Sequence, residues 1–197
     1  IVSGQAKNIL VVTSDTYSKF IQKNNVNTRI LFGYGSASTL VSSKKKHNSY
    51  QVHSFAYGTD GSGYNNAIIN NFGSRYWNNP KKGGDSLNLD GPGIYDFGVK
   101  TVSAAISEYL KKNNILLNKI DYFIFHQANE YIIRNLQLKL QIPNKKILMN
   151  MSNIGNTVSS SIPIVLHKYS DKIPSKKNIL LIGFGGGLSW GVCLIKK

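Results

Sequence analysis

Three short stretches of the sequence carry groups that could act on a substrate oxygen atom. His126 directly follows the apolar run 122–125, which has the length of a buried strand. Asn156 stands at the predicted start of a helix, and the loop 183–187 (Gly-Phe-Gly-Gly-Gly) follows another apolar run. An imidazole, an amide and the backbone N–H groups of an open glycine loop can all donate hydrogen bonds to an oxygen on which negative charge develops. The chemistry that these groups have in common is stabilisation of an oxyanion.

Each of these features also has an ordinary structural interpretation. An isolated histidine is usually a surface or structural residue, an asparagine is a frequent helix cap, and a glycine-rich loop is often a tight turn. The loop does not have the pattern of a phosphate cradle, because no Gly-Lys-Ser/Thr follows it and it leads into a strand. Position alone therefore leaves both interpretations open. The other histidines have no comparable setting and are interpreted as surface residues: His47, His53 and His167.

The cysteine content and the apolar runs exclude several classes of protein. Cys193 is the single cysteine, so no internal disulfide is expected, and no Cys/His pair has the spacing of a zinc site. The longest apolar runs, 9–12 and 179–182, are far shorter than the ~20 residues that span a bilayer. No signal-peptide pattern is present at the N-terminus. We therefore expect a soluble, cytoplasmic protein without a metal site or a membrane span.

The formal net charge of +15 is compatible with binding a polyanion. The lysines occur as pairs and one triplet, which are spread over predicted loops and helix ends and accompanied by many asparagines. This distribution is typical of a lysine-biased proteome rather than of a nucleic-acid-binding face. Neither nucleic acid nor a membrane surface is therefore expected as a partner. An acidic protein or a small molecule that bears phosphate fits the charge better.

The alternation of apolar runs with amphipathic segments indicates an α/β protein. Residues 7–15 form a continuous apolar run of the kind found in strands buried on both faces, and a second strand-like stretch covers 29–41. Residues 44–93 are polar and rich in Gly, Asn and Pro, which indicates a connecting insertion with loops. The elements predicted after it are a helix at 94–112, a strand at 122–125, a helix before Pro143, a strand at 147–151, a helix ending near Tyr169 and a strand at 178–182.

Two of the predicted strands begin with the same residues. Positions 7–10 and 177–180 both read Lys-Asn-Ile-Leu, and each opens an apolar run that is followed by a glycine-containing turn and a further strand. A match of this length can arise by chance in a sequence biased toward Lys, Asn and Ile. If it reflects a duplication, the protein has two structurally repeated halves, of which the first is present only at its end.

Three longer motifs follow one another in a fixed order. They are His-Gln-Ala-Asn at 126–129, Gly-Asn-Thr-Val-Ser-Ser-Ser-Ile-Pro at 155–163 and Phe-Gly-Gly-Gly-Leu-Ser-Trp-Gly at 184–191. In sequence and order they resemble the closing motifs of the β-ketoacyl-acyl-carrier-protein synthase III family of condensing enzymes, and this set of motifs is highly specific. The resemblance covers essentially the whole chain, including Ile-Leu-Phe-Gly at 30–33 and Asp-Gly-Ser-Gly at 60–63.

The resemblance implies a thiolase-like fold, in which each subunit is a duplicated pair of α/β halves with αβαβα architecture. It implies that residues 1–43 are the end of the first half, that 44–93 connect the halves, and that 94–197 are the complete second half. In this family the nucleophilic cysteine starts the helix before the first of the two repeated strands. The chain opens with Ile1 rather than Met, so this cysteine and most of the first half are expected upstream. Cys193 is not expected to be the nucleophile.

The resemblance also implies a reaction, the decarboxylative Claisen condensation of an acyl thioester with malonyl carrier protein, as in fatty acid biosynthesis. His126 and Asn156 are then expected to bind the malonyl thioester carbonyl, and the Gly186 N–H to form part of an oxyanion hole for the second step. No cofactor is expected, because the acyl groups arrive on CoA or phosphopantetheine. The expected partners are acyl carrier protein or CoA thioesters, the missing first half and a second subunit of a homodimer. The other residues expected to contact substrate are Phe184, Gly155, Gly185 and Gly187.

The sequence departs from the family pattern at two positions. Tyr34 stands where the family usually has the Asp of Gly-Asp-Gly, and Tyr131 stands where the fatty-acid-initiating enzymes commonly have an Arg that helps to dock the carrier. These differences favour a diverged member, of the kind found in surface-polysaccharide or secondary-metabolite pathways. Two alternatives stay open: a hydroxymethylglutaryl-CoA synthase-like or related acyltransferase, and a non-catalytic interaction fragment.

Overall fold

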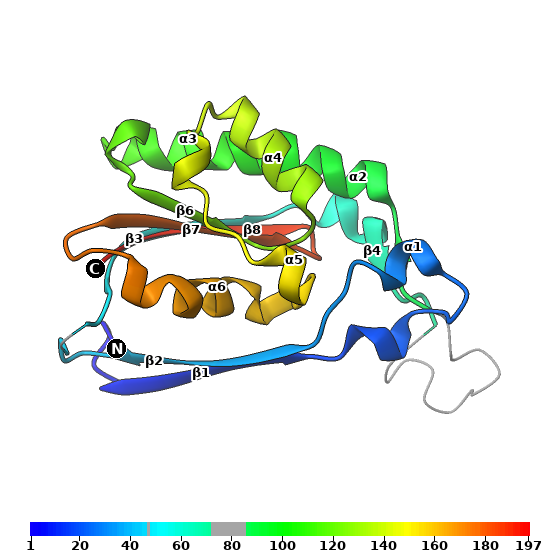
Figure 1. The fold of residues 1–197 in the computed structure, drawn as a ribbon, viewed down its shortest axis with the longest axis horizontal. Coiled ribbons are helices and arrows are strands. Elements are labelled where there is room, and N and C mark those ends of the chain that lie inside the picture. The colour runs from blue at the N-terminus through cyan, green and yellow to red at the C-terminus, as the bar shows by residue number, and fades with distance from the viewer. Residues whose placement is uncertain (47, 72–85) are drawn as a thin grey trace.

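The computed structural model describes residues 1–46, 48–71 and 86–197, so His47 lies outside the described residues. Figure 1 shows the described elements stacked in layers. The layers are, in order, a two-stranded sheet, a helical layer that contains α6 (Ser161–Tyr169), a four-stranded sheet and an outer layer of helices. Stacked sheets and helices of this kind define an α/β architecture, as the alternating sequence pattern predicted.

The four-stranded sheet has the strand order β3-β8-β7-β6. β6 and β7 are parallel, whereas β8 is antiparallel to both of its neighbours. β3 comes from the segment that was interpreted as a connecting insertion, so part of 44–93 belongs to this sheet. The strands are β3 (Gln51–Thr59), β6 (Tyr122–Phe125), β7 (Asn178–Gly185) and β8 (Ser189–Lys196), and two further short strands, β4 (Ala67–Ile68) and β5 (Asn88–Leu89), pair with each other beside the sheet.

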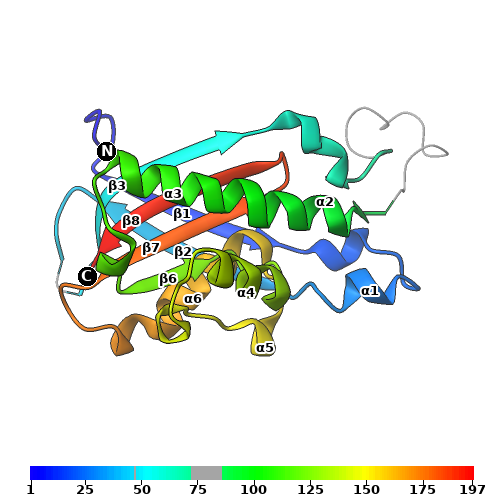
Figure 2. The ribbon, with the colours of Figure 1, turned by 90° about the horizontal axis from the view of Figure 1, so that it is seen from above.

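The outer helical layer covers one face of this sheet. α2 (Gly91–Asp96) continues through a π-helical stretch, Phe97–Val102, into α3 (Ser103–Lys112), which confirms the helix predicted at 94–112 with a start three residues earlier. Figure 2 shows α2 and α3 lying along the sheet, with α4 (Glu130–Lys139) beside them. In the described part of the chain, no helix has the length and apolar character needed to cross a membrane.

Two clusters of buried side chains hold the layers together, one on each face of the sheet. Successive side chains of a strand point to opposite faces, so Phe123 and Phe125 of β6 pack under the outer helices while Ile124 packs against the α6 side. Burial on both faces is the reason why β6 and β7 are continuous apolar runs. The outer cluster includes Ile106, Ile133, Leu136 and Ile182, and the α6 cluster includes Val165, Ile173, Ile179 and Ile195.

Two predictions of local structure are wrong. The strand predicted at 147–151 is reduced to a single bridge between Ile147 and Phe123, and α5 (Met151–Ile154) begins where the strand was expected to end. The segment 147–151 is apolar because it is a loop that is buried at the edge of the sheet. The strand predicted at 29–41 begins only at Gly35, because Asn25 caps the short helix α1 (Val26–Arg29) by accepting a hydrogen bond from Thr28.

The two repeated sequence runs form equivalent antiparallel pairs. β1 (Asn8–Asp15) pairs with β2 (Gly35–Ser42) along its whole length, and β7 pairs with β8 in the same way. Their burial differs. Leu180 of β7 is 0% exposed, whereas Leu10, at the matching position of β1, is 61% exposed. The prediction that 7–15 is buried on both faces is therefore wrong for this structure, because no described residue covers the outer face of β1.

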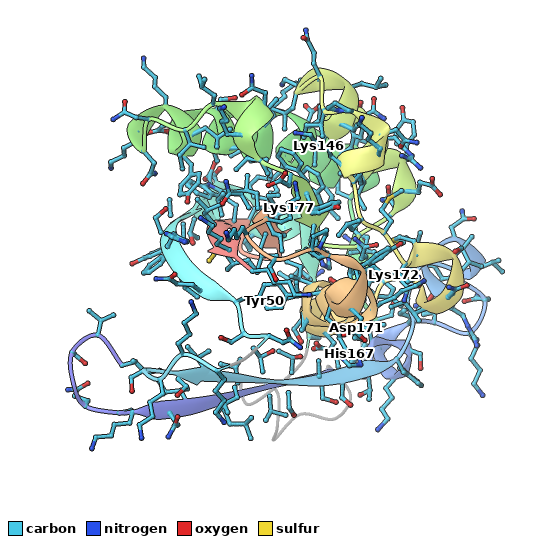
Figure 3. All side chains as sticks on the ribbon, turned by 60° about the vertical axis from the view of Figure 1, so that its left-hand side comes forward. Tyr50, Lys146, His167, Asp171, Lys172 and Lys177 are labelled. Atoms are coloured by element: carbon cyan, nitrogen blue, oxygen red, sulfur yellow. The ribbon has the colours of Figure 1, made fainter. Side chains whose placement is uncertain are left out.

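Several lysines gather at one end of the molecule. Figure 3 shows Lys146, Lys172 and Lys177 at the end where β6 and β7 begin, opposite the strand ends that lead to His126. Lys177 pairs with Asp121 at 3.0 Å, and Lys146 Nζ donates to the backbone carbonyl of Asn118. Lys146 and Lys177 therefore satisfy acceptors in the turns of this end, which the composition alone does not reveal.

Candidate active site

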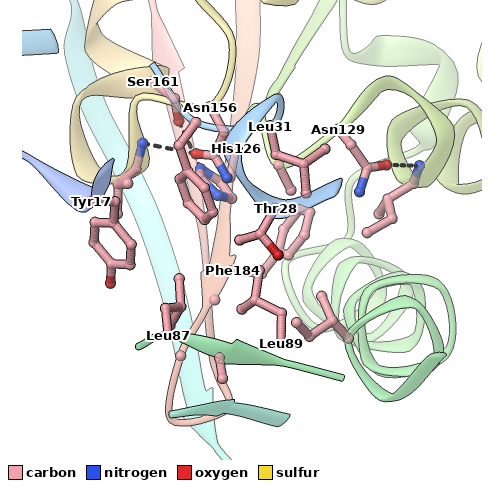
Figure 4. Close-up of a pocket in the computed structure, with 18 of the residues that line it drawn as sticks. Tyr17, Thr28, Leu31, Leu87, Leu89, His126, Asn129, Asn156, Ser161 and Phe184 are labelled. Carbon is pink, nitrogen blue, oxygen red and sulfur yellow. Dashed lines mark hydrogen bonds between the residues drawn. The ribbon is translucent and has the colours of Figure 1, made fainter. Parts of the chain in front are cut away.

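A pocket of about 560 Å³ lies at the carboxyl ends of β6 and β7, where ligands bind in many α/β proteins. Both His126 and Asn156 line it, as Figure 4 shows. Among the described residues that line the pocket there is no Asp, Glu, Lys, Arg or Cys. The described wall therefore offers neutral hydrogen-bond donors in an apolar setting, without a cysteine. Much of that wall is made by Leu31, Leu87, Leu89, Ile94, Phe97 and Ile132.

His126 is the first residue after β6, and its backbone extends the sheet. Its N–H donates to the carbonyl of Ile182 at 2.7 Å, which fixes the main chain against β7. The ring lies edge-on to Phe184, with 5.5 Å between the ring centroids and an interplanar angle of 84°. Burial lowers the pKa of His126 from 6.5 to about 4, and a hydrogen bond with the Val158 backbone acts weakly in the opposite direction. The imidazole is therefore neutral at pH 7.

Asn156 is held by its backbone and by its side chain. Its N–H donates to the Leu31 carbonyl at 2.8 Å, and its carbonyl accepts from the Gly33 N–H at 2.9 Å. Its Oδ1 accepts the N–H of Val158 at 2.8 Å. A backbone N–H can be met only by the amide oxygen, which leaves the amide N–H₂ group of Asn156 as the donor for a ligand.

Val158 has an unusual backbone conformation. Its φ is +52°, in the left-handed region that β-branched residues rarely adopt. This conformation turns its N–H toward Asn156 Oδ1. Strained residues of this kind occur where the surrounding structure fixes them, often at functional sites. We therefore count Val158 as part of the site, although its apolar side chain gave no signal in the sequence.

The glycine residues predicted to contact substrate fall into two groups. Gly185 and Gly186 line the pocket together with Phe184. Gly155 and Gly187 are not among the lining residues. Each instead allows a backbone conformation or a close approach that a side chain would hinder. Gly155 has φ +63° and lies so close to the 31–33 segment that an added Cβ would be 3.0 Å from the Leu31 carbonyl oxygen, while Gly187 has φ +136° in the turn that leads to β8.

Two buried polar residues beside His126 gave no signal of a role in the sequence. Ser161 Oγ lies 2.7 Å from His126 Nδ1. Gln127 is buried, donates through Nε2 to the Phe125 carbonyl and accepts the Asn150 N–H through Oε1. Both residues lie inside the quoted motifs, but only the folded geometry brings Ser161 to the ring across 35 residues of sequence.

The two positions that depart from the family pattern lie outside the pocket wall. Tyr131 is exposed and stacks on Tyr95, with 5.4 Å between the ring centroids. Tyr34 is also exposed, and its hydroxyl contacts Ser18 Oγ. Both substitutions therefore change the surface of the described residues rather than the donors that face the pocket.

The layered fold and the His–Asn pocket define a thiolase-like α/β protein, and family comparisons agree. Residues 110–197 match the family model described as 3-Oxoacyl-[acyl-carrier-protein (ACP)] synthase III C terminal. Residues 1–61 match the model described as 3-Oxoacyl-[acyl-carrier-protein (ACP)] synthase III. The chain belongs to the 3-oxoacyl-acyl-carrier-protein synthase III family.

Individual relatives show how much of the family length the chain represents. It is 36% identical to the β-ketoacyl-[acyl-carrier-protein] synthase III of Clostridium perfringens, over 98% of this chain and 60% of the relative. The enzyme of the same name from Streptococcus pyogenes is 35% identical over 100% of this chain and 61% of its own length. A solved 3-oxoacyl-(acyl-carrier-protein) synthase III superposes with a TM-score of 0.87 at 28% identity, over 100% of this chain and 62% of that structure. The chain thus spans about 60% of the length of the curated relatives it matches.

Proposed function

We propose that this chain carries the malonyl-binding part of an acyltransferase of the 3-oxoacyl-acyl-carrier-protein synthase III type. One observation carries the proposal: a neutral imidazole, His126, and an oriented amide, Asn156, line the same apolar pocket. No charged side chain lines the described wall, so none competes with these two donors for an oxyanion. Two neutral donors in such a setting suit a carbonyl oxygen that becomes negative during the reaction.

In the first step, a malonyl thioester loses CO₂ and the electrons of the broken C–C bond form an enolate. The negative charge collects on the thioester oxygen, which accepts hydrogen bonds from His126 and from the Asn156 amide. These bonds are stronger to the enolate than to the neutral thioester, so they lower the barrier by differential binding. Removal of one donor from a comparable site costs about 3 kcal/mol of transition-state stabilisation.

In the second step, the carbanion attacks an acyl group held as a thioester on a cysteine. The described pocket wall has no cysteine, so we propose that the nucleophile belongs to the part of the family length that this chain does not span. The Gly186 N–H would then bind the oxygen of the acyl thioester, and Phe184 would form the wall beside it. The acyl groups would arrive on carrier protein or CoA, without a further cofactor.

The same proposal gives a partner to the exposed apolar side chains of the first sheet. Leu10, Val12 and Leu40 are exposed on β1 and β2, although their sequence pattern suits burial. We propose that the part of the first half that this chain does not span covers this face. A homodimer and a cytoplasmic location, for which family resemblance is the support, belong to the same proposal for the complete enzyme.

The position of Tyr131 supports a diverged role rather than initiation of fatty acid synthesis. A tyrosine offers no cation to an acidic carrier, and the exposed ring of Tyr131 stacks on Tyr95 instead. Product mass spectrometry with malonyl and acetyl donors on carrier protein and on CoA distinguishes this synthase from a hydroxymethylglutaryl-CoA synthase-like enzyme.

The test is malonyl-thioester decarboxylation by the complete protein, reconstituted with its first half. His126→Ala and Asn156→Ala should each lower the rate about 100-fold, because each removes one oxyanion donor. His167→Ala is the matched control, since this residue lies in α6 outside the pocket wall and should leave the rate unchanged. Unchanged rates in both pocket variants would overturn the assignment.

A further inference from the structure

The part of the pocket wall formed by residues 17–28 carries polar side chains that have no role in the proposed chemistry. They are Tyr17, Asn27 and Thr28, and all three line the pocket (Figure 4 labels Tyr17 and Thr28). They come from the short helix Tyr17–Phe20 and from α1. In a mostly apolar ligand pocket, a small number of polar groups sets the orientation and the specificity of the ligand. This segment therefore offers a ligand a second group of polar contacts.

Other polar side chains of the wall already have partners inside the protein. Asn129 Oδ1 accepts the Ile132 N–H at 2.8 Å, and the Ser159 hydroxyl donates to the carboxylate of Asp15. By contrast, no hydrogen bond among the described residues uses one of the three polar side chains on the segment 17–28. Their donors and acceptors are therefore left for whatever the pocket holds.

Thr28 is the most informative of the three, because it is buried. It is 8% exposed, and its backbone N–H donates to Asn25 Oδ1 at 3.1 Å, whereas its hydroxyl has no partner among the described residues. A threonine in a helix can bond its hydroxyl to a carbonyl one turn earlier, and this bond is not made here. A buried hydroxyl without a partner costs free energy. A ligand that forms a hydrogen bond with Thr28 removes that cost.

Tyr17 is held in place by an aromatic stack. Its ring lies parallel to that of Phe32, with 5.1 Å between the centroids and an interplanar angle of 14°. Burial raises the pKa of Tyr17, and the nearby charge of Asp15 raises it further. The hydroxyl is therefore protonated at pH 7 and can both donate and accept a hydrogen bond.

We infer that the pocket takes an acyl group that carries an uncharged hydroxyl, which Thr28 and Tyr17 recognise. A hydroxyl on the acyl chain both donates and accepts, as the hydroxyls of these two residues do. No charged side chain of the described wall would pair with a carboxylate or an ammonium group on the chain. A plain alkyl chain would leave the Thr28 hydroxyl buried without a partner. The inference rests on the proposed function, because it takes the ligand to be the acyl thioester of that reaction.

The first test compares acyl donors of equal carbon number in the complete enzyme, reconstituted with its first half. The donors are butanoyl-CoA, 2-hydroxybutanoyl-CoA and 3-hydroxybutanoyl-CoA, and condensation with a malonyl thioester is followed as kcat/KM. At least one hydroxyacyl donor should exceed butanoyl-CoA by about tenfold or more, because a site that bonds a hydroxyl discriminates against a substrate without it. If butanoyl-CoA is used as well as both hydroxyacyl donors, or better, the inference is wrong. This comparison needs no variant to fold.

Two variants then assign the recognition to particular residues. Thr28→Val keeps the shape of the side chain without its hydroxyl, and Tyr17→Phe keeps the ring that stacks on Phe32. Each should lower kcat/KM about tenfold for the preferred hydroxyacyl donor and leave that of butanoyl-CoA within about twofold. Thr101→Val is the matched control, since this exposed residue lies outside the pocket wall and should change neither value. A structural defect lowers both donors alike, so equal losses for the two donors in both pocket variants would overturn the inference.

Binding measurements separate this inference from the proposed function, because they need no turnover. Calorimetric titration of the chain with the same three CoA thioesters should show tighter binding of a hydroxyacyl thioester, and Thr28→Val should remove the difference. If no acyl donor reacts while this pattern of binding is found, the proposed function fails and the ligand class stands. If malonyl decarboxylation proceeds while the three thioesters bind equally, the proposed function stands and this inference fails.

Discussion

The strands β1 and β7 begin with the same three residues, each preceded by a lysine, and pair with their next strands in the same way, yet one is exposed and the other is buried. The outer helices and α6 cover both faces of β7. The described chain covers β1 only on the side of α6 (Figure 1). An apolar run therefore indicates that a strand is suited to burial. Whether the strand is buried depends on the layers that are present around it.

The exposed sheet nevertheless contributes to the site. Asp15, at the end of β1, accepts hydrogen bonds from the N–H and the hydroxyl of Ser159, and Thr13 contacts Ser160 Oγ at 2.9 Å. The segment that leads to β2 pairs with the backbone of Asn156. The first sheet thus fixes the loop that presents the amide, while the second sheet fixes the imidazole. Each half supplies the support for one of the two donors.

The largest expected difference between the two strands is in the cost of truncating matching side chains. Leu180→Ala should lower the free energy of unfolding by about 2–5 kcal/mol, because it leaves a cavity in a fully buried position. Leu10→Ala should cost less than about 1 kcal/mol, since most of this side chain is already in water. Urea unfolding of the two variants measures both values. Equal losses would show that β1 is buried in solution and would contradict the difference in burial between β1 and β7.

This contrast also explains what the sequence could predict. Elements with a complete environment, such as α3, β6 and β7, were predicted within a few residues, because burial imposes the helical or strand period on them. The segment 147–151 failed because a buried loop is as apolar as a strand. At the site, the motifs identified His126 and Asn156. The roles of Ser161 and Val158 depend on a long-range contact and on a positive φ, and neither leaves a pattern in the sequence.

Acid stability should report on the buried ring of His126 in the second half. The pKa of His126 is about 4 in the folded protein, because burial disfavours the charged ring, and its usual value is 6.5. Between these values the unfolded chain binds a proton that the folded protein does not, so stability is complete above pH 6.5 and falls as the pH drops toward 4. The loss should reach at most about 3 kcal/mol. Urea unfolding from pH 7 to pH 4 measures it.

Substitution of the ring isolates this contribution. His126→Gln should remove that part of the pH dependence, whereas His53→Gln, on the exposed strand β3, should retain it. If His126→Gln keeps the full loss of stability in acid, the ring is not held neutral by burial.

The smallest effect on stability should come from charge on the exposed strand. Leu10→Lys combined with Val12→Lys should change the free energy of unfolding by less than about 0.5 kcal/mol, because both side chains already face water. The same pair should sharply reduce self-association of the chain and its binding to the first half, since lysine disrupts an apolar surface that would otherwise be covered. Sedimentation velocity and urea unfolding on the same samples separate the two effects. Unchanged association would mean that β1 is not a contact surface. A missing binding partner would then not explain why β1 is exposed and β7 is buried.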